Sequence, residues 1–223
     1  MKRFLFLLSI ILVISVAINA QSKNVFTLSQ FSFEDTAGKK FSLDTLKGKV
    51  VFIDCWFPGC PPCRAEMPYA QLLQKRLHKM QMDSNIVFVT INFKQSKEIW
   101  LNALHTLPMP SAIHLYSPAG TYEQTFTKHS FPTYRIFNAK GVLDEESCEA
   151  PTSNGVVDFV LFAAQKGLSV KQAMKILLSQ KEVTKSKLAL IKNPLLKEFW
   201  TKYFDHVNAS YNCYSSTYTL FTR

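Results

Sequence analysis

The sequence predicts an α/β domain with a β-hairpin before it and a helical segment after it. Strand-like apolar runs alternate with helix-like stretches between residues 50 and 166, and the run Val50–Trp56 is almost entirely apolar. Such a run suits a strand of a parallel sheet that is covered on both faces. The 223 residues, of which 47% are hydrophobic, suffice for one domain with extensions.

The first twenty residues have the pattern of a secretory signal. Lys2 and Arg3 form a basic start, and the apolar run at 4–18 is shorter than the roughly 20 residues of a membrane span. We expect residues 1–20 to be a cleaved signal peptide, with an uncleaved anchor as the alternative, and residues 21–28 to be a linker. Export places the chain in the periplasm or cell envelope, where disulfides persist.

Residues 29–167 contain the predicted domain. A hairpin is expected around the turn at 35–38, because strand-like residues flank it on both sides. The other predicted strands and helices follow from apolar periodicity. Strands are expected at 50–56, 86–93, 111–116, 133–137 and 142–145, the last two joined as a hairpin, and helices at 64–82, 96–107 and 154–166.

Residues 168–223 extend beyond this alternation and are predicted to be helical. Ser169 and Gln172 form a capping box that begins one helix. Asn193-Pro194 begins another, whose apolar face carries Leu195, Phe199, Trp200 and Tyr203. We expect this face to pack on the domain, with contact to a partner or a membrane surface as the alternative.

Two cysteines follow the first buried strand. Cys60 takes the N-cap position of a helix, and Pro61 and Pro62 occupy the first turn, where proline is tolerated. The positive end of the helix dipole favours a thiolate and lowers the pKa of Cys60 below the ordinary value of about 8.5. Cys63 lies one turn further on. We expect Cys60, the more exposed, to attack and Cys63 to resolve; a structural disulfide or half of a four-ligand zinc site is the alternative.

The segment from Cys60 to Pro68 resembles the active site of thioredoxin-fold thiol-disulfide oxidoreductases, specifically the TlpA/ResA-like group. It reads C-P-P-C, then a basic residue and E-x-P, and Gly48-Lys49-Val50-Val51 is similar to the strand entry of that group. With Phe131-Pro132-Thr133 downstream, the resemblance covers roughly residues 29–166. The chain departs from it at Gly59, where relatives often have tryptophan.

The resemblance implies a thioredoxin-like fold and four further site residues. Asp54 matches the buried acid that relays a proton for the second cysteine, and burial should raise its pKa. Glu66 matches the glutamate after the cysteine motif. Pro132 matches a cis-proline that faces the cysteines, and Phe131 before it would offer its backbone to a substrate strand. A structural role is the alternative for Asp54, and an ordinary helix-dipole pairing for Glu66.

Thr90, on the predicted neighbouring strand, takes the place of a lysine that often accompanies the buried acid in thioredoxins. Cys55 is expected to be a small buried hydrophobe. Cys148 and Cys213 are able to pair in an oxidising compartment.

The resemblance implies an envelope enzyme that reduces disulfides of exported proteins, such as an apocytochrome c. Its partners are protein disulfide or dithiol substrates and an upstream electron donor. Its redox centre is the Cys60–Cys63 pair, with no dissociable cofactor and no metal. A redoxin-type peroxidase and a copper-binding chaperone, with His129 as a candidate ligand, are alternatives. The third alternative is an interaction protein that binds its partner through the C-terminal segment.

The net charge of +10 fits a basic solvated surface. The sequence contains no nucleic-acid-binding motif, so no nucleic-acid partner is expected. Membrane contact is expected only if the N-terminal segment stays uncleaved.

Overall fold

A six-stranded mixed sheet forms the centre of the protein in this computed structural model, which describes residues 25–180, 183 and 185–207. The order across the sheet is β2-β1-β5-β4-β3-β6. Strands β3, β4 and β5 are parallel, whereas β6 and β1 run antiparallel to their neighbours. The strands are β1 (Ser32–Glu34), β2 (Lys40–Ser42), β3 (Val50–Trp56), β4 (Ile86–Asn92), β5 (Ile113–Tyr116) and β6 (Thr133–Phe137).

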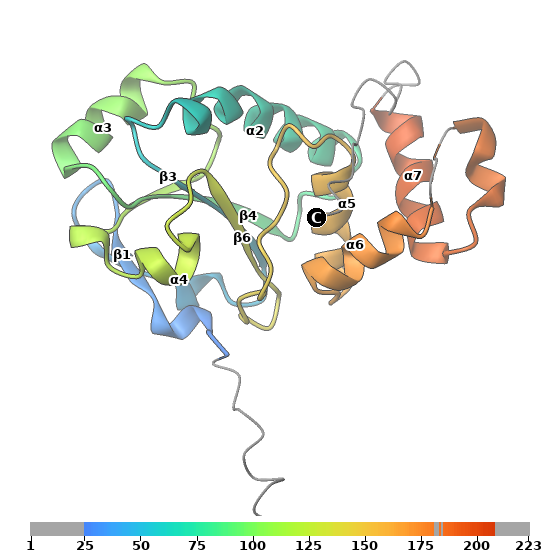
Figure 1. The fold of residues 1–223 in the computed structure, drawn as a ribbon, viewed down its shortest axis with the longest axis horizontal. Coiled ribbons are helices and arrows are strands. Elements are labelled where there is room, and N and C mark those ends of the chain that lie inside the picture. The colour runs from blue at the N-terminus through green and yellow to red at the C-terminus, as the bar shows by residue number, and fades with distance from the viewer. Residues whose placement is uncertain (1–24, 181–182, 184, 208–223) are drawn as a thin grey trace, which may run out of the picture.

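Helices cover both faces of the sheet (Figure 1). Helices α2 and α3 lie along one face and α4 lies on the opposite side, while α5, α6 and α7 form a helical group at one end. The helices are α2 (Pro61–Lys79), α3 (Lys97–Thr106), α4 (Glu123–Thr127), α5 (Val156–Gln165), α6 (Val170–Leu178) and α7 (Pro194–His206). Short 3-10 turns are η1 (Leu28–Gln30), η2 (Leu43–Leu46), η3 (Pro118–Gly120) and η4 (Lys185–Leu190).

Strand β3 is buried along its whole length because both of its faces are covered. Phe52 faces the apolar cluster that includes Leu73 and Leu77 of α2 and most of α5. Ile53, of opposite parity, faces the cluster beneath the sheet that contains Phe126 of α4. The expected α/β fold with an N-terminal hairpin and a C-terminal helical extension is therefore confirmed.

Four segments differ from the expectation. The strand expected at 142–145 is reduced to single bridges, Phe137↔Leu143 and Thr27↔Val142. The Asp144 amide still donates to the Ile136 carbonyl of β6, but the Asp144 carboxylate accepts from the Glu146 amide at 3.1 Å and forms a turn there, before Cys148 pairs with Tyr134 again.

Helix α2 ends at Lys79 instead of residue 82, because Gln81 adopts a φ of 56°. The expected linker at 21–28 also overlaps the fold at its end. Phe26 and Leu28 pack into the cluster beneath the sheet, and Leu28 is buried. Helix α4 was not predicted at all.

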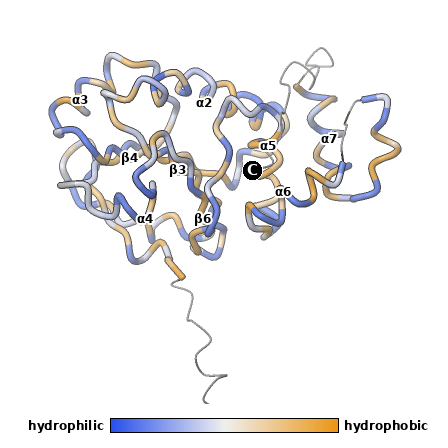
Figure 2. The backbone as a smooth tube through the Cα atoms, in the orientation of Figure 1, coloured by the Kyte–Doolittle hydropathy of each residue, from blue (hydrophilic) through white to orange (hydrophobic). Residues whose placement is uncertain are grey.

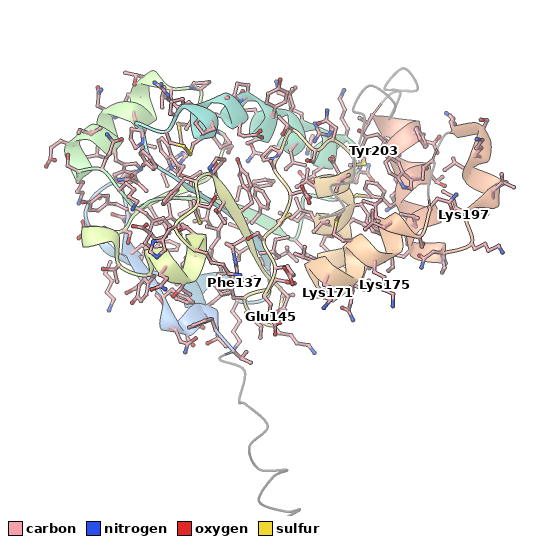
Figure 3. All side chains as sticks on the ribbon, viewed as in Figure 1. Phe137, Glu145, Lys171, Lys175, Lys197 and Tyr203 are labelled. Atoms are coloured by element: carbon pink, nitrogen blue, oxygen red, sulfur yellow. A yellow bond between two sulfur atoms is a disulfide. The ribbon has the colours of Figure 1, made fainter. Side chains whose placement is uncertain are left out.

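The helices of the C-terminal extension begin where the sequence predicted. Ser169 and Gln172 form the capping box of α6, and Asn193 caps α7 through its side chain. The aromatic face of α7 packs on α5, with the Phe199 and Phe159 ring centroids 5.2 Å apart, which confirms the packing interpretation. Both helices alternate hydrophobic and hydrophilic residues (Figure 2), and Lys171 and Lys175 lie on the exposed side of α6 (Figure 3).

The expected signal peptide and the expected partner cysteine Cys213 lie outside the described residues. Among residues 25–180, 183 and 185–207, no helix combines the length and the apolar character that crossing a bilayer requires.

Candidate active site

Cys60 and Cys63 are joined by a disulfide at the start of α2, with 5.3 Å between their Cα atoms. Cys60 is the N-cap residue, and its sulfur accepts a hydrogen bond from the Cys63 amide at 3.2 Å. Pro61 takes the first helical position, where the missing N–H costs nothing. The helix start thus supplies Cys60 with an amide donor and with the positive end of the helix dipole.

Both cysteines are buried in this disulfide form, with 3% of the residue exposed for Cys60 and 1% for Cys63. Cys60 is the more exposed, as expected, but only slightly. The cause is the surrounding apolar cluster of Trp56, Met67 and Trp100, which encloses the start of α2. Position at the helix end, rather than exposure, therefore distinguishes the two cysteines.

The loop before Cys60 is held by Gln95. The Gly59 amide donates to the Gln95 side-chain oxygen, and the Asn92 side chain donates to the Gln95 carbonyl at 2.8 Å. A Cβ at position 59 would lie 3.1 Å from Gln95 Nε2 and 3.2 Å from Oε1. Glycine therefore suits this position, because a tryptophan there would displace the Gln95 amide.

Asp54 lies on β3 with only 6% exposure, and its Oδ1 has no hydrogen-bond partner. Burial, together with a smaller contribution from the nearby charge of Glu66, raises the pKa of this carboxyl from 3.8 to about 7. In the sheet register, Asp54 lies opposite Thr90 on β4 and Tyr134 on β6. The predictions that the Asp54 pKa is raised and that Thr90 is its neighbour are confirmed.

The Glu66 side chain binds the loop before α5. Its carboxylate accepts from the Thr152 amide at 3.0 Å and from the Thr152 hydroxyl at 2.8 Å. It does not belong to the first turn of α2, so the helix-dipole pairing is wrong. Glu66 therefore holds the 150–155 loop and acts on Asp54 through its charge.

The peptide bond between Phe131 and Pro132 is cis, as predicted. The Phe131 ring packs edge-on against Phe57 at 5.2 Å and contacts the cluster that contains both cysteines. Lys94 places its Nζ 5.7 Å from the centre of the same ring. The fold therefore brings Phe131, which lies 71 residues after Cys60 in the chain, to the cluster that contains the cysteine pair, and Pro132 follows it.

The remaining candidates lie apart from this centre. Cys55 and Cys148 are buried free thiols, and burial raises the pKa of both. Exposed His129 lies 3.5 Å from Glu123, which also pairs with Lys94 at 2.7 Å. No group of three or more histidine, cysteine or acidic side chains that could hold a metal ion occurs among the residues that the structure describes.

Sequence reasoning missed Gln95, Asn92 and Thr152. Asn92 carried a signal, since it is a polar residue at the end of an apolar strand. Gln95 and Thr152 carried none, because their roles depend on contacts to Gly59 and Glu66 that only the fold creates.

Comparison with known proteins agrees with this geometry. The redoxin family matches residues 24–158. The chain is 32% identical over 120 residues to thioredoxin-like protein YneN of Bacillus subtilis, a match that covers 52% of this chain and 65% of YneN. It is 37% identical over 67 residues to the thiol-disulfide oxidoreductase ResA of the same organism, covering 30% of this chain and 35% of ResA. The matches thus span less than two thirds of either relative.

The solved structure of MTB DsbF shares the fold. It is 18% identical in sequence with a TM-score of 0.50, and the match covers 62% of this chain and 99% of DsbF. The strand order, the cysteine pair at a helix start and the family match over residues 24–158 lead to one assignment: this chain belongs to the redoxin family.

Proposed function

We propose that the protein is a thiol-disulfide oxidoreductase of the cell envelope that reduces disulfides of exported proteins. The observation that carries this proposal is the Cys60–Cys63 disulfide at the start of α2, which follows directly on the strand that carries Asp54, a buried acid whose pKa is raised to about 7. The relatives named as thiol-disulfide oxidoreductases support the activity. The basic, apolar N-terminal segment supports the location.

The reaction begins with the reduced pair. The Cys60 thiolate attacks one sulfur of a substrate disulfide, which forms a mixed disulfide and releases the first substrate thiolate. Cys63 then gives its proton to Asp54 and attacks the Cys60 sulfur. The second substrate thiolate leaves, and the Cys60–Cys63 disulfide seen in the structure forms. An upstream dithiol donor returns two electrons and restores the reduced pair.

Asp54 suits the role of general base in the second step. A base works best when its pKa lies near the working pH, and burial brings the pKa of Asp54 to about 7. Phe131 and Pro132 would receive the substrate as an added extended strand beside the cysteines. A substrate with a solvent-exposed disulfide in an extended segment, such as an unfolded apocytochrome c, fits this mode of binding.

Trapping tests the proposal. Cys63→Ser should accumulate mixed disulfides with exported proteins, because the resolving thiol is absent, whereas Cys60→Ser should trap none and lose turnover on a disulfide-bonded peptide. Cys148→Ala, which removes a buried thiol outside the motif, is the matched control and should retain turnover. Trapping by Cys60→Ser but not Cys63→Ser would reverse the two roles.

Two further measurements separate the alternatives. Turnover of hydrogen peroxide faster than of the peptide would favour a peroxidase, and copper bound in proportion to the two thiols would favour a chaperone. Cell fractionation with sequencing of the mature N-terminus tests the location. Residues 1–20 should be missing from the exported protein.

A further inference from the structure

Charge is unevenly divided along this chain. Residues 25–165, which contain the sheet and the helices from α2 to α5, have 13 lysines and arginines and 13 acidic residues. Residues 166–223 have 10 basic residues and 3 acidic ones. The first part is therefore neutral, and the C-terminal extension carries a net charge of +7. An excess of one charge in one segment is typical of a segment that contacts an anionic partner.

Four lysines of the extension are exposed and form no ion pair within the part of the chain that the structure describes. They are Lys171, Lys175, Lys192 and Lys197. The two described acidic residues of the extension are already paired with other lysines. Asp205 lies 3.4 Å from the Nζ of Lys185. Glu198 lies 3.8 Å from the Nζ of Lys202. The four lysines therefore keep their charge available to a partner.

Two exposed leucines lie beside these lysines. Leu178 is 50% exposed, and it shares a face of α6 with Lys171 and Lys175, which precede it by seven and three residues. Leu190 is 67% exposed at the end of η4, two residues before Lys192. Exposed lysines with leucines among them are the pattern of a helical segment that lies in a membrane–water interface. We call Lys171, Lys175, Leu178, Leu190, Lys192 and Lys197 the lysine-rich end.

The lysine-rich end lies away from the cysteine pair. Figure 3 shows Lys171, Lys175 and Lys197 on the helical group, with Lys197 far from the sheet. Helix α2 begins at the cysteines and contacts α5 through its last turn, where Arg76 binds Asp158. Its 19 residues span about 28 Å. A surface that binds the lysine-rich end would therefore leave the cysteines open to substrates.

We propose that the lysine-rich end binds the surface of an anionic phospholipid bilayer. The inference goes beyond the proposed reaction, and the proposed envelope location puts a bilayer beside the protein. The lysine ammonium groups pair with lipid phosphates, and the two leucine side chains enter the interface. This contact needs no uncleaved N-terminal segment and no helix that crosses the bilayer.

A lipid surface fits the lysine-rich end better than an acidic peptide does. A peptide needs a groove, and the groove beside these lysines, of about 700 Å³, lies between α6 and the loop at 146–149. Glu146 and Glu149 line that groove together with Lys171 and Lys175, so its acidic wall repels an acidic peptide. Leu190, Lys192 and Lys197 lie outside the groove, where a flat anionic surface can reach them.

Vesicle sedimentation tests this surface. The chain from residue 21 is used, because the apolar N-terminal run would bind lipid by itself and the described fold begins at residue 25. It should bind vesicles that contain phosphatidylglycerol and should bind phosphatidylcholine vesicles poorly. Lys192→Gln combined with Lys197→Gln should weaken binding roughly 25-fold, about fivefold per lysine. Leu178→Ser combined with Leu190→Ser should weaken binding even at high salt, which screens the lysines.

Lys39→Gln combined with Lys40→Gln is the matched control, because it removes the same charge from exposed positions on the N-terminal hairpin. It should bind vesicles as the unmodified chain does. Turnover of a disulfide-bonded peptide in solution should be the same in every variant. A chain that binds the vesicles but reduces no peptide would keep the membrane surface and lose the proposed reaction.

Two results would overturn the inference. One is an absence of binding to the phosphatidylglycerol vesicles, or an equal loss of binding in the hairpin control. The other is tighter binding to poly-glutamate than to the vesicles, with no effect of the leucine substitutions, which would assign the lysine-rich end to an acidic protein.

Discussion

Replacing Asp54 by asparagine should stabilise the protein, and the gain should depend on pH. The carboxyl has a pKa of about 7 in the folded chain and 3.8 as its reference value. The folded state therefore holds the proton more tightly than the unfolded state does. Since one pKa unit is worth about 1.4 kcal/mol, a shift of roughly three units corresponds to about 4 kcal/mol, which is a ceiling for a single buried group.

The sign follows from which state loses its proton first. Below pH about 4 the carboxyl is protonated in both states and contributes no difference. Between pH about 4 and 7 the unfolded chain ionises while the folded chain does not, so the folded state loses relative stability. Above pH about 7 the full penalty remains. Asparagine cannot ionise, so Asp54→Asn should gain nothing at the acidic end and up to about 4 kcal/mol at the basic end.

Urea denaturation of the disulfide form measures this difference. Trp56 and Trp100 lie in the cluster around the cysteines and Trp200 lies on α7, so tryptophan fluorescence reports both ends of the molecule. The exposed Asp44→Asn is the matched control, because it removes a carboxylate that the fold does not bury. An equal gain in stability at acidic and basic pH would mean that packing, not ionisation, causes the effect. No gain in stability at any pH would refute the idea that burying the Asp54 carboxylate destabilises the fold.

Two further predictions concern the helical end of the protein. Arg76→Ala should lower the free energy of unfolding in urea by roughly 3–5 kcal/mol, because it leaves the fully buried Asp158 carboxylate without the two Arg76 nitrogens that bind it at 2.8 and 3.0 Å. Arg76→Lys should recover part of the loss, and a loss smaller than that of an exposed ion pair would contradict the reasoning. Gly155→Ala should lower the free energy of unfolding by roughly 1–3 kcal/mol more than Gly167→Ala does. Both glycines have a positive φ, but only a Cβ at position 155 would lie 2.8 Å from the Trp200 ring. Equal melting temperatures for the two variants would show that the Trp200 contact does not matter.

The features of the fold and of the site that depend on local sequence pattern were predictable. The apolar run, the turn after it and the two prolines predicted that Cys60 begins a helix, and the alternation along the strand predicted that Asp54 shares a face with Phe52 and Trp56. The resemblance added the cis bond at Pro132. These features depend on neighbours in sequence or on one recognised motif.

The features that depend on contacts between residues far apart in the sequence were not predictable. Glu66 binds Thr152, which is 86 residues away, and no local pattern marks that pair. Thr90 was identified as the neighbour of Asp54, but its bond to His114 depends on the register of a third strand. The 142–145 segment has the alternation of a strand, yet it forms only single bridges, and the Asp144 carboxylate instead accepts from the Val170 amide at the start of α6, 26 residues away.

Helix α5 has a consequence for where this protein can be divided. Every residue from Val156 to Ala164 is buried, so the helix has no solvent face and needs cover on all sides. The sheet and α2 cover one side, and α6 and α7 cover the other. The match to the redoxin family ends at residue 158, inside this helix. The end of the similarity is therefore not the end of the cooperative folding unit. A chain truncated at residue 158 would expose apolar side chains to water, whereas the cooperative folding unit includes α7.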